Sequence, residues 1–326
     1  MSPNEESGVA VWSTPEWRAE AVAWLDERLA AVGRARTGPV EQPRVRPWAT
    51  LLRAPTAGGP VWMKAAGPGT AFEPALYEIL VRAVPDRVLT PIAVDRGRAW
   101  ILLPDGGPSL GERASGADVV EPLVAALARY GRLQRALEPY VGDLLDAGVP
   151  DMRPAAMPGR FRQALDATRA GGGEVHERVT ALEPAFRVWC ERLAASPVPP
   201  SLDHNDLHPW NIIGDRYYDW GDSVVAHPFA AVLVPLRFVQ LGLGAGLDDP
   251  RFLRARDAYL DAFAGLAGLT ELGETLALAC RVAKIARVLT WERALQAARE
   301  QGAVDADWAG APLATLATVL DPSYLG

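Results

Sequence analysis

Three polar side chains that could act together in catalysis lie between residues 201 and 225, in the segment SLDHNDLHPWNIIGDRYYDWGDSVV. Asp206 is followed five positions later by Asn211, and Asp219 comes after the short run IIGDRYY. Carboxylate and amide oxygens such as those of Asn211 and Asp219 are hard ligands of the kind Mg²⁺ prefers. Asp206 could orient an attacking hydroxyl and accept its proton. Together the three residues predict transfer of a phosphoryl group.

The position of Asp219 depends on a short hairpin that the sequence predicts just before it. Ile212-Ile213 and Tyr217-Tyr218 are expected to form its two arms, and Gly214-Asp215 its turn. Because the arms of a hairpin run antiparallel, this element would bring Asp219 back beside Asn211.

The same segment resembles the catalytic region of a known superfamily. HNDLHPWN matches the kinase catalytic loop, in which His-x-Asp is followed by Asn five residues after the Asp, and DWG at 219–221 resembles the metal-binding Asp-Phe-Gly motif. The His-Pro pair in the loop and the Asp-Trp pair are most similar to the aminoglycoside phosphotransferase family and its choline kinase-like relatives. The resemblance covers about residues 45–300, with strong motifs in the back half and weak ones in front. It implies a bilobal, protein kinase-like α+β fold.

The resemblance also implies roles for these residues. Asp206 would be catalytic, Asn211 and Asp219 would bind Mg²⁺, and ATP or GTP would donate the phosphate. The acceptor would be a hydroxyl of a small molecule, with an aminoglycoside or another amino-sugar or amino-alcohol compound as the leading class. A metabolic kinase of the choline, homoserine or fructosamine type, or a nucleotide-binding pseudokinase, are the alternatives. His208 could either stabilise the loop or line the substrate pocket.

A second group of residues is implied in the front half, where the family has a strand-borne lysine paired with a glutamate on the following helix. Lys64, in PVWMKAA, ends a strand candidate and is the only lysine there. Glu73 and Glu78 both lie on the next helical segment, and the spacing of Glu73 to the apolar residues of that helix fits the family better. Lys64 and Glu73 are therefore the expected nucleotide-binding pair. The hairpin 48–64 would cover the nucleotide, and AWILLPDGGPSL would form the hinge.

Three positions depart from the family pattern. Asn205 stands where the family usually has glycine, Trp210 replaces a small residue just before the metal-binding asparagine, and Gln134 occupies a position where many relatives carry histidine. Neither of the first two changes removes a reacting group. The chain also has no Walker A lysine motif, which excludes a P-loop NTPase.

The elements predicted along the chain separate into a strand-rich front and a helix-rich back. Helices are expected over 15–33 and 71–83, and strands in WATLLRA, PVWMKAA, VLTPIAV and RAWILL, with PTAGG as a hairpin turn. PDGGPSL breaks this pattern, and the chain is helical and rich in Ala and Leu from about residue 117. We therefore expect an N-terminal helix and nucleotide-binding lobe over 1–104 and a helical lobe over 105–326.

The amino-acid composition narrows the classes of protein to which the chain can belong. The 326 residues are 49% hydrophobic and 22% charged, as in a globular protein, and the net charge of −7 argues against a protein that coats nucleic acid. No stretch is expected to span a membrane, and the opening MSPNEESG lacks the features of a signal peptide, so a cytoplasmic location is expected. Cys190 and Cys280 are expected to be buried free thiols. The oligomeric state is left open.

Overall fold

The computed structural model describes residues 8–302, 304 and 306–325. The described residues form two compact units. The first consists of the chain up to Gly107 together with the segment Glu292–Ala309, and the second of Pro108–Trp291 with the segment that begins at Gly310. The first segment of the first unit ends three residues after the lobe boundary expected at residue 104, and the roles expected for the two lobes stay predictions. The opening residues MSPNEES lie outside the described part.

The first unit is built on an antiparallel sheet with the strand order β1-β2-β3-β5-β4. Its strands are β1 (Glu41–Arg46), β2 (Ala49–Ala54), β3 (Val61–Ala66), β4 (Ala93–Asp95) and β5 (Trp100–Pro104). The predicted hairpin is confirmed, because β2 and β3 pair from Ala49↔Ala66 to Ala54↔Val61. Lys64 of β3 is paired on its other side with Ile101 of β5. The lysine therefore lies on the central strand of the sheet.

Strand β1 lies before WATLLRA, the first strand that the sequence predicts, and is therefore an additional strand. Its residues EQPRVR are mostly exposed and include a proline. β1 lies at the edge of the sheet, and its register with β2 shifts between Glu41 and Arg44, around Pro43. An edge strand tolerates proline at such an irregularity because one of its sides needs no ladder hydrogen bonds.

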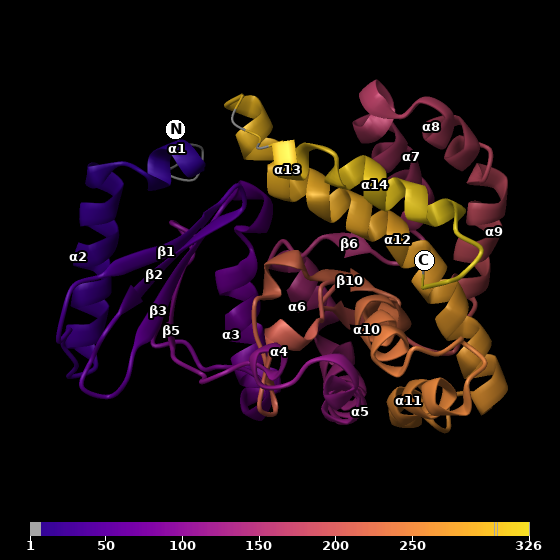
Figure 1. Cartoon of the computed structure of the whole chain (residues 1–326), viewed down its shortest axis with the longest axis horizontal. Helices are drawn as coiled ribbons and strands as arrows, with labels where there is room; N and C mark the ends of the chain where they lie inside the picture. Colours follow the sequence, from indigo (N-terminus) through magenta and orange to yellow (C-terminus); the bar gives the residue numbers. More distant parts are fainter. Residues whose placement is uncertain (1–7, 303, 305, 326) are drawn as a thin grey trace. The chain divides into compact units, whose positions relative to one another are not determined.

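The described residues of the first unit also form four complete α-helices, one of which carries the partner of Lys64. They are α1 (Val9–Trp12), α2 (Pro15–Ala31), α3 (Glu73–Ala83) and α13 (Ala306–Ala309). The side chain of Thr14 accepts a hydrogen bond from the Trp17 amide and so caps α2, which begins with Pro15. In Figure 1, α2 lies along the sheet. Its residues Trp24, Leu25 and Leu29 join buried side chains of β2, β3 and β5 in one core.

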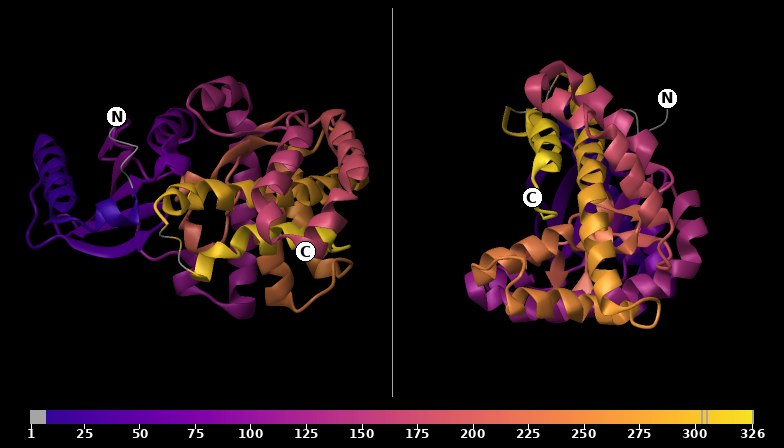
Figure 2. Two further views of the ribbon diagram at one scale, coloured as in Figure 1. Left: turned by 90° about the horizontal axis from the view of Figure 1, so that it is seen from above. Right: turned by 90° about the vertical axis from the view of Figure 1, so that its right-hand side faces the viewer.

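The second unit is mainly helical, as the sequence predicted. Its helices are α4 (Leu110–Arg113), α5 (Val120–Leu137), α6 (Val141–Asp146), α7 (Met157–Thr168), α8 (Gly173–Thr180), α9 (Glu183–Ala194), α10 (Leu233–Leu243), α11 (Pro250–Leu260) and α14 (Ala311–Ala317). The long helix α12 (Leu269–Glu300) begins in this unit, and its last residues belong to the first. α14 and the segment after it lie alongside α12 (Figure 2), where the Lys284 ammonium donates to the carbonyls of Thr318 and Ser323.

Two small sheets interrupt the helices of the second unit. One has the strand order β6-β10-β7, from β6 (Asp151–Met152), β10 (Val224–Ala226) and β7 (Ser201–Asp203). The other is the hairpin of β8 (Ile212–Ile213) and β9 (Arg216–Tyr217). Strands β7 and β10 lie at the two ends of the segment singled out by the sequence, and the β8–β9 hairpin lies within it. A mixed fold with a five-stranded antiparallel sheet and a helical remainder confirms the predicted α+β class.

Two further expectations can be compared with this fold. Cys190 and Cys280 are buried and form no disulfide, as predicted. Within the described residues, no helix is both long and apolar enough to span a membrane.

Candidate active site

The loop that carries Asp206 begins at the end of β7 and is shaped by Asn205. Asn205 has a φ of +60°, in the left-handed region that disfavours most side chains but that glycine and asparagine adopt. Its backbone amide donates to the Asp203 carboxylate at 2.6 Å. Its side-chain amide donates to the Asp222 carbonyl at 3.2 Å and to the Thr290 hydroxyl at 2.7 Å. This explains the departure from glycine, since asparagine tolerates the conformation and also ties the loop to two other segments.

His204 belongs to the same loop, and its side chain is buried. Its Nε2 lies 2.9 Å from the Tyr218 carbonyl, and its ring lies 4.7 Å from that of the buried Trp220. Burial lowers the pKa of His204, although the Tyr218 carbonyl and the nearby carboxylates of Asp206 and Asp219 oppose this shift. A neutral, buried imidazole with these contacts has a structural role in the loop.

The Asp206 carboxylate lies between the His208 imidazole and the Arg287 guanidinium. His208 Nε2 is 3.4 Å from one of its oxygens, and the Arg287 guanidinium is 3.3 Å from the other. Burial alone would raise the pKa of Asp206, but the hydrogen bond from His208 and the charge of Arg287 outweigh it and hold the pKa at about 2. Asp206 is therefore ionised at neutral pH. An ionised carboxylate can accept a hydrogen bond from a hydroxyl and orient it.

The predicted hairpin is confirmed and brings Asp219 back toward Asn211. Ile212 pairs with Tyr217, and the Tyr218 amide donates to the Asn211 carbonyl at 3.2 Å, so Asp219 follows the residue that faces Asn211. Gly214, with a φ of +57°, occupies the turn. The negative charge of Asp219 favours the protonated forms of His204 and His208, and so acts to raise the pKa of each.

Two oxygens of this cluster suit a magnesium ion. The Asn211 side-chain nitrogen donates to the Asp206 carbonyl at 3.0 Å, which leaves the amide oxygen as the available ligand atom. Asp219 supplies a carboxylate. Mg²⁺ is commonly bound through one or two carboxylates, with water and substrate phosphates completing an octahedron, so the donor set fits that ion. Among the described residues, no group of three or more His, Cys, Asp or Glu residues could hold a metal ion by itself.

The Lys64–Glu73 pair is formed within the first unit. Lys64 Nζ lies 2.6 Å from a Glu73 carboxylate oxygen, and the glutamate side chain is only 1% exposed. Glu73 is the first residue of α3, directly after the turn that follows β3. Glu78, the other candidate, forms an ion pair with Arg96 on the exposed surface. Of the two glutamates, the structure therefore brings Glu73 to the lysine.

The other two departures from the family pattern have structural explanations. Gln134 is buried, and its side chain donates to the Leu202 and Pro228 carbonyls at 2.9 Å and accepts from the Tyr259 hydroxyl at 2.6 Å. It thereby joins the loop segments before and after the candidate site. Trp210 is 47% exposed and forms an aromatic cluster with His208 and Phe238.

Sequence reasoning missed Arg287. The residue lies on α12, 81 positions after Asp206. Its guanidinium donates to the Asn205 carbonyl as well as contacting Asp206. The only signal in the sequence is its spacing of three residues from Lys284, which places two cations on one face of a helix. That pattern usually marks a solvated helix surface.

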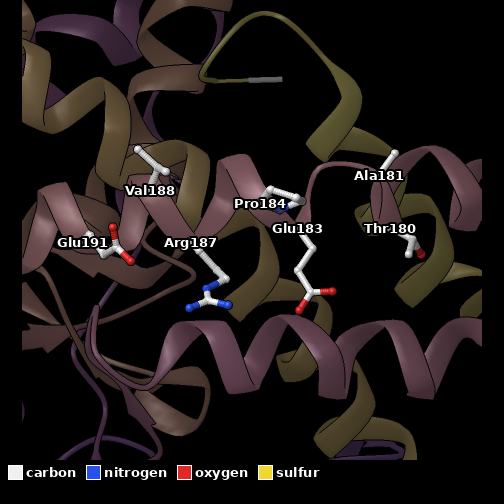
Figure 3. A pocket seen from close by; sticks show the side chains of 7 residues that line it. All are labelled: Thr180, Ala181, Glu183, Pro184, Arg187, Val188 and Glu191. Atoms are coloured by element: carbon white, nitrogen blue, oxygen red, sulfur yellow. The ribbon is translucent and has the colours of Figure 1, made fainter.

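A separate pocket in the second unit contains none of the predicted site residues. It has a volume of about 580 Å³ and is formed by the end of α8 and by α9, with Glu183, Arg187 and Glu191 along it (Figure 3). Both acidic and basic side chains line this pocket. The candidate site is therefore the cluster around Asp206 rather than this surface hollow.

No family model matches the chain, and no curated protein matches its sequence. Solved structures do match it over nearly its whole length. A macrolide 2'-phosphotransferase type I has 16% identity and a TM-score of 0.60, covering 93% of this chain and 97% of that one. A choline kinase from Streptococcus pneumoniae has 15% identity and a TM-score of 0.57, covering 92% and 99%.

A third match was solved with bound ligands. It is a spectinomycin phosphotransferase in complex with ADP and spectinomycin, with 12% identity and a TM-score of 0.51, covering 93% of this chain and 96% of that one. These three proteins are named as kinases or phosphotransferases of small molecules. The chain has the fold of the aminoglycoside phosphotransferase and choline kinase family.

Proposed function

We propose that this protein is a small-molecule kinase, which transfers the γ-phosphate of ATP or GTP to a hydroxyl group. The observation that carries the proposal is the cluster of Asp206, Asn211 and Asp219, in which an ionised carboxylate lies beside two oxygen ligands suited to Mg²⁺. The fold is consistent with it. A kinase needs this arrangement because phosphoryl transfer depends chiefly on positioning and on stabilising charge.

In the proposed reaction, the acceptor oxygen forms a bond to the γ-phosphorus while the bond between this phosphorus and the β-phosphate oxygen breaks. The acceptor proton passes to Asp206, and the nucleoside diphosphate leaves. A pKa of about 2 makes Asp206 a weak base. This suffices because the loose transition state needs little deprotonation of the hydroxyl before the new bond forms.

The remaining residues would position the nucleotide. Mg²⁺, when bound, would neutralise the charge that develops on the phosphates. Asn211 and Asp219 would hold the ion, and Lys64, oriented by Glu73, would contact the α- and β-phosphates. These assignments rest on the motif order and on the Lys64–Glu73 contact of 2.6 Å.

The proposal is tested by calorimetric titration with Mg²⁺ and a non-hydrolysable ATP or GTP analogue. Lys64→Met and Asp219→Ala should each weaken binding by about ten-fold or more, because each removes a charged contact to the phosphates or the metal. Asp206→Asn should bind like the wild type, since this residue is proposed to contact the acceptor instead. Equal binding by all four proteins, or no binding by the wild type, would refute the nucleotide site.

A metabolic kinase is favoured over an aminoglycoside kinase by one observation. Of the described residues that line the pocket beside Arg287, three are cationic and none is acidic. Polycationic aminoglycosides would be poorly accommodated by such a lining.

A further inference from the structure

A pocket of about 210 Å³ lies next to the candidate catalytic carboxylate within the second unit. Arg287 forms part of its wall and also contacts Asp206 at 3.3 Å. Phe238 forms another part, and its ring lies 6.4 Å from that of His208, the other partner of Asp206. The pocket therefore adjoins the group proposed to orient the acceptor. It is smaller than the roughly 300–1,000 Å³ typical of sites for drug-sized ligands.

Three cations line this pocket: Arg237 on α10, and Lys284 and Arg287 on α12. The other lining residues are apolar or carry a hydroxyl, with Leu233, Phe238 and Leu325 among them. Among the described residues, none that lines this pocket is acidic. A cationic amino-alcohol would meet like charges here, whereas an anion would meet opposite ones.

The three cations differ in how far the protein's own carboxylates and hydrogen-bond acceptors compensate their charges. Arg287 is paired with Asp206. Lys284 is buried, donates to two carbonyls of the C-terminal segment, and lies in the field of Asp321. Arg237 donates to the Gln240 side chain at 2.7 Å and forms no ion pair with any carboxylate of the described chain.

The Arg237 guanidinium is thus half-buried, and its hydrogen-bond partner among the described residues is a neutral side chain, so that other N–H groups can still donate to a ligand. Partial burial makes an uncompensated charge costly, and a guanidinium presents several N–H groups in a plane that matches a carboxylate or phosphate. Arg237 could therefore bind the carboxylate or phosphate group of a ligand, and the apolar lining residues could contact the rest of that ligand.

We propose that the acceptor is a small alcohol carrying a carboxylate or phosphate group, which Arg237 binds while the hydroxyl faces Asp206. This inference rests on the proposed kinase function and narrows it to an anionic acceptor class. It departs from the amino-sugar and amino-alcohol class that the sequence resemblance implies.

The test uses three-carbon alcohols that differ mainly in charge. They are glycerate and glycerol 3-phosphate as anions, glycerol as the neutral compound and 2-amino-1,3-propanediol as the cation. Binding is measured by calorimetry with Mg²⁺ and a saturating non-hydrolysable ATP analogue, so that the nucleotide site is filled. At least one anion should bind ten-fold or more tightly than both the neutral and the cationic alcohol. The stronger anion identifies whether the carboxylate or the phosphate is preferred.

Variants connect the binding to Arg237. Arg237→Gln should weaken binding of the preferred anion by about ten-fold or more, because a charged hydrogen bond is lost, and Arg237→Lys should restore part of it. Arg132→Gln, which removes an exposed arginine of α5 outside the pocket, serves as the matched control and should bind like the wild type. Thermal unfolding of each variant checks that it is folded.

Three outcomes would overturn the inference: no anion binds, the neutral or cationic alcohol binds as well as the anions, or Arg237→Gln binds the anion like the wild type. ADP release with hydrolysable ATP is followed in parallel. Arg237-dependent anion binding without ADP release from any acceptor would support the anion site and count against the kinase function. ADP release with only the neutral or cationic alcohol would support the kinase function and refute the anion site.

Discussion

At the scale of single residues, the geometry of the candidate site depends on a few buried contacts made by the loop after β7. Asn205 adopts a left-handed conformation and its side chain bonds to Asp222 and Thr290, so that one residue joins the Asp206 loop, the metal-motif loop and α12. Arg287 donates to the Asn205 carbonyl and contacts Asp206. The orientation of Asp206 is therefore fixed through its neighbours as well as by its own side chain.

Asn205 can be tested by two substitutions that separate backbone strain from hydrogen bonding. In Asn205→Gly the left-handed conformation is still adopted without strain, but two side-chain hydrogen bonds are lost, each worth about 1 kcal/mol. Asn205→Ala loses the same bonds and also places a Cβ in that conformation, which costs about 1 kcal/mol more. Urea unfolding should rank the proteins as wild type, then Gly, then Ala, in order of decreasing stability.

The control for strain alone is Gly214→Ala, because Gly214 also has a left-handed φ and a Cβ there would meet nothing within 4 Å. The loss of unfolding free energy in Gly214→Ala should equal the difference in unfolding free energy between Asn205→Gly and Asn205→Ala. If Asn205→Gly unfolds at the same urea concentration as the wild type, the two side-chain bonds contribute nothing and the account of this loop is wrong.

At the scale of elements, the segments that flank the site are held by buried polar groups. His227 follows β10, and its side chain accepts a hydrogen bond from the Phe229 amide at 3.3 Å and so caps the segment Pro228–Val232. Its ring is buried, which lowers the pKa of His227 to about 3. The folded protein therefore favours the neutral imidazole, whereas the unfolded chain binds a proton near pH 6.5.

This difference predicts loss of stability in acid. The contribution of His227 is complete above pH 6.5 and falls by about 1.4 kcal/mol per pH unit as the pH decreases from 6.5 toward 3. His227→Asn keeps a capping acceptor but does not titrate, so the free energy of unfolding should fall by about 2 kcal/mol less than in the wild type between pH 7 and pH 5. Urea titrations at several pH values measure this.

His176→Asn, in α8, controls for the loss of a histidine elsewhere in the same unit. Equal losses of unfolding free energy in wild type and His227→Asn over this pH range would mean that His227 does not favour its neutral form in the fold.

Local elements were the part of the structure that the sequence predicted well. Alternating apolar runs around turn residues identified the β2–β3 and β8–β9 hairpins, whose pairing needs only neighbouring residues. β1 was missed because an exposed edge strand with a proline has no apolar periodicity. Arg287 and Arg237 were missed because their proximity to the candidate site depends on how α10 and α12 pack, which their local sequence does not encode.

At the scale of the whole molecule, the two compact units carry separate parts of the proposed machinery. The first holds the Lys64–Glu73 pair on the central strand and the following helix, and the second holds Asp206, Asn211 and Asp219 together with the cationic pocket. The roles assigned to all five residues remain proposals. The fold itself was predictable from the ordered motifs, because those motifs recur with a fixed spacing in kinase-like proteins.

The central claim is that Asp206 orients the acceptor during phosphoryl transfer, and steady-state ADP release tests it most directly. The assay uses the acceptor that gives the most ADP in the panel, with Asp206→Asn compared with the wild type and with Asp248→Asn, an exposed aspartate, as the control. Asp206→Asn keeps the shape of the side chain but loses its basicity, so kcat should fall by about 10²–10⁴-fold while the KM for nucleotide stays within about two-fold. An unchanged kcat for Asp206→Asn, with chemistry shown to be rate-limiting, would contradict the account.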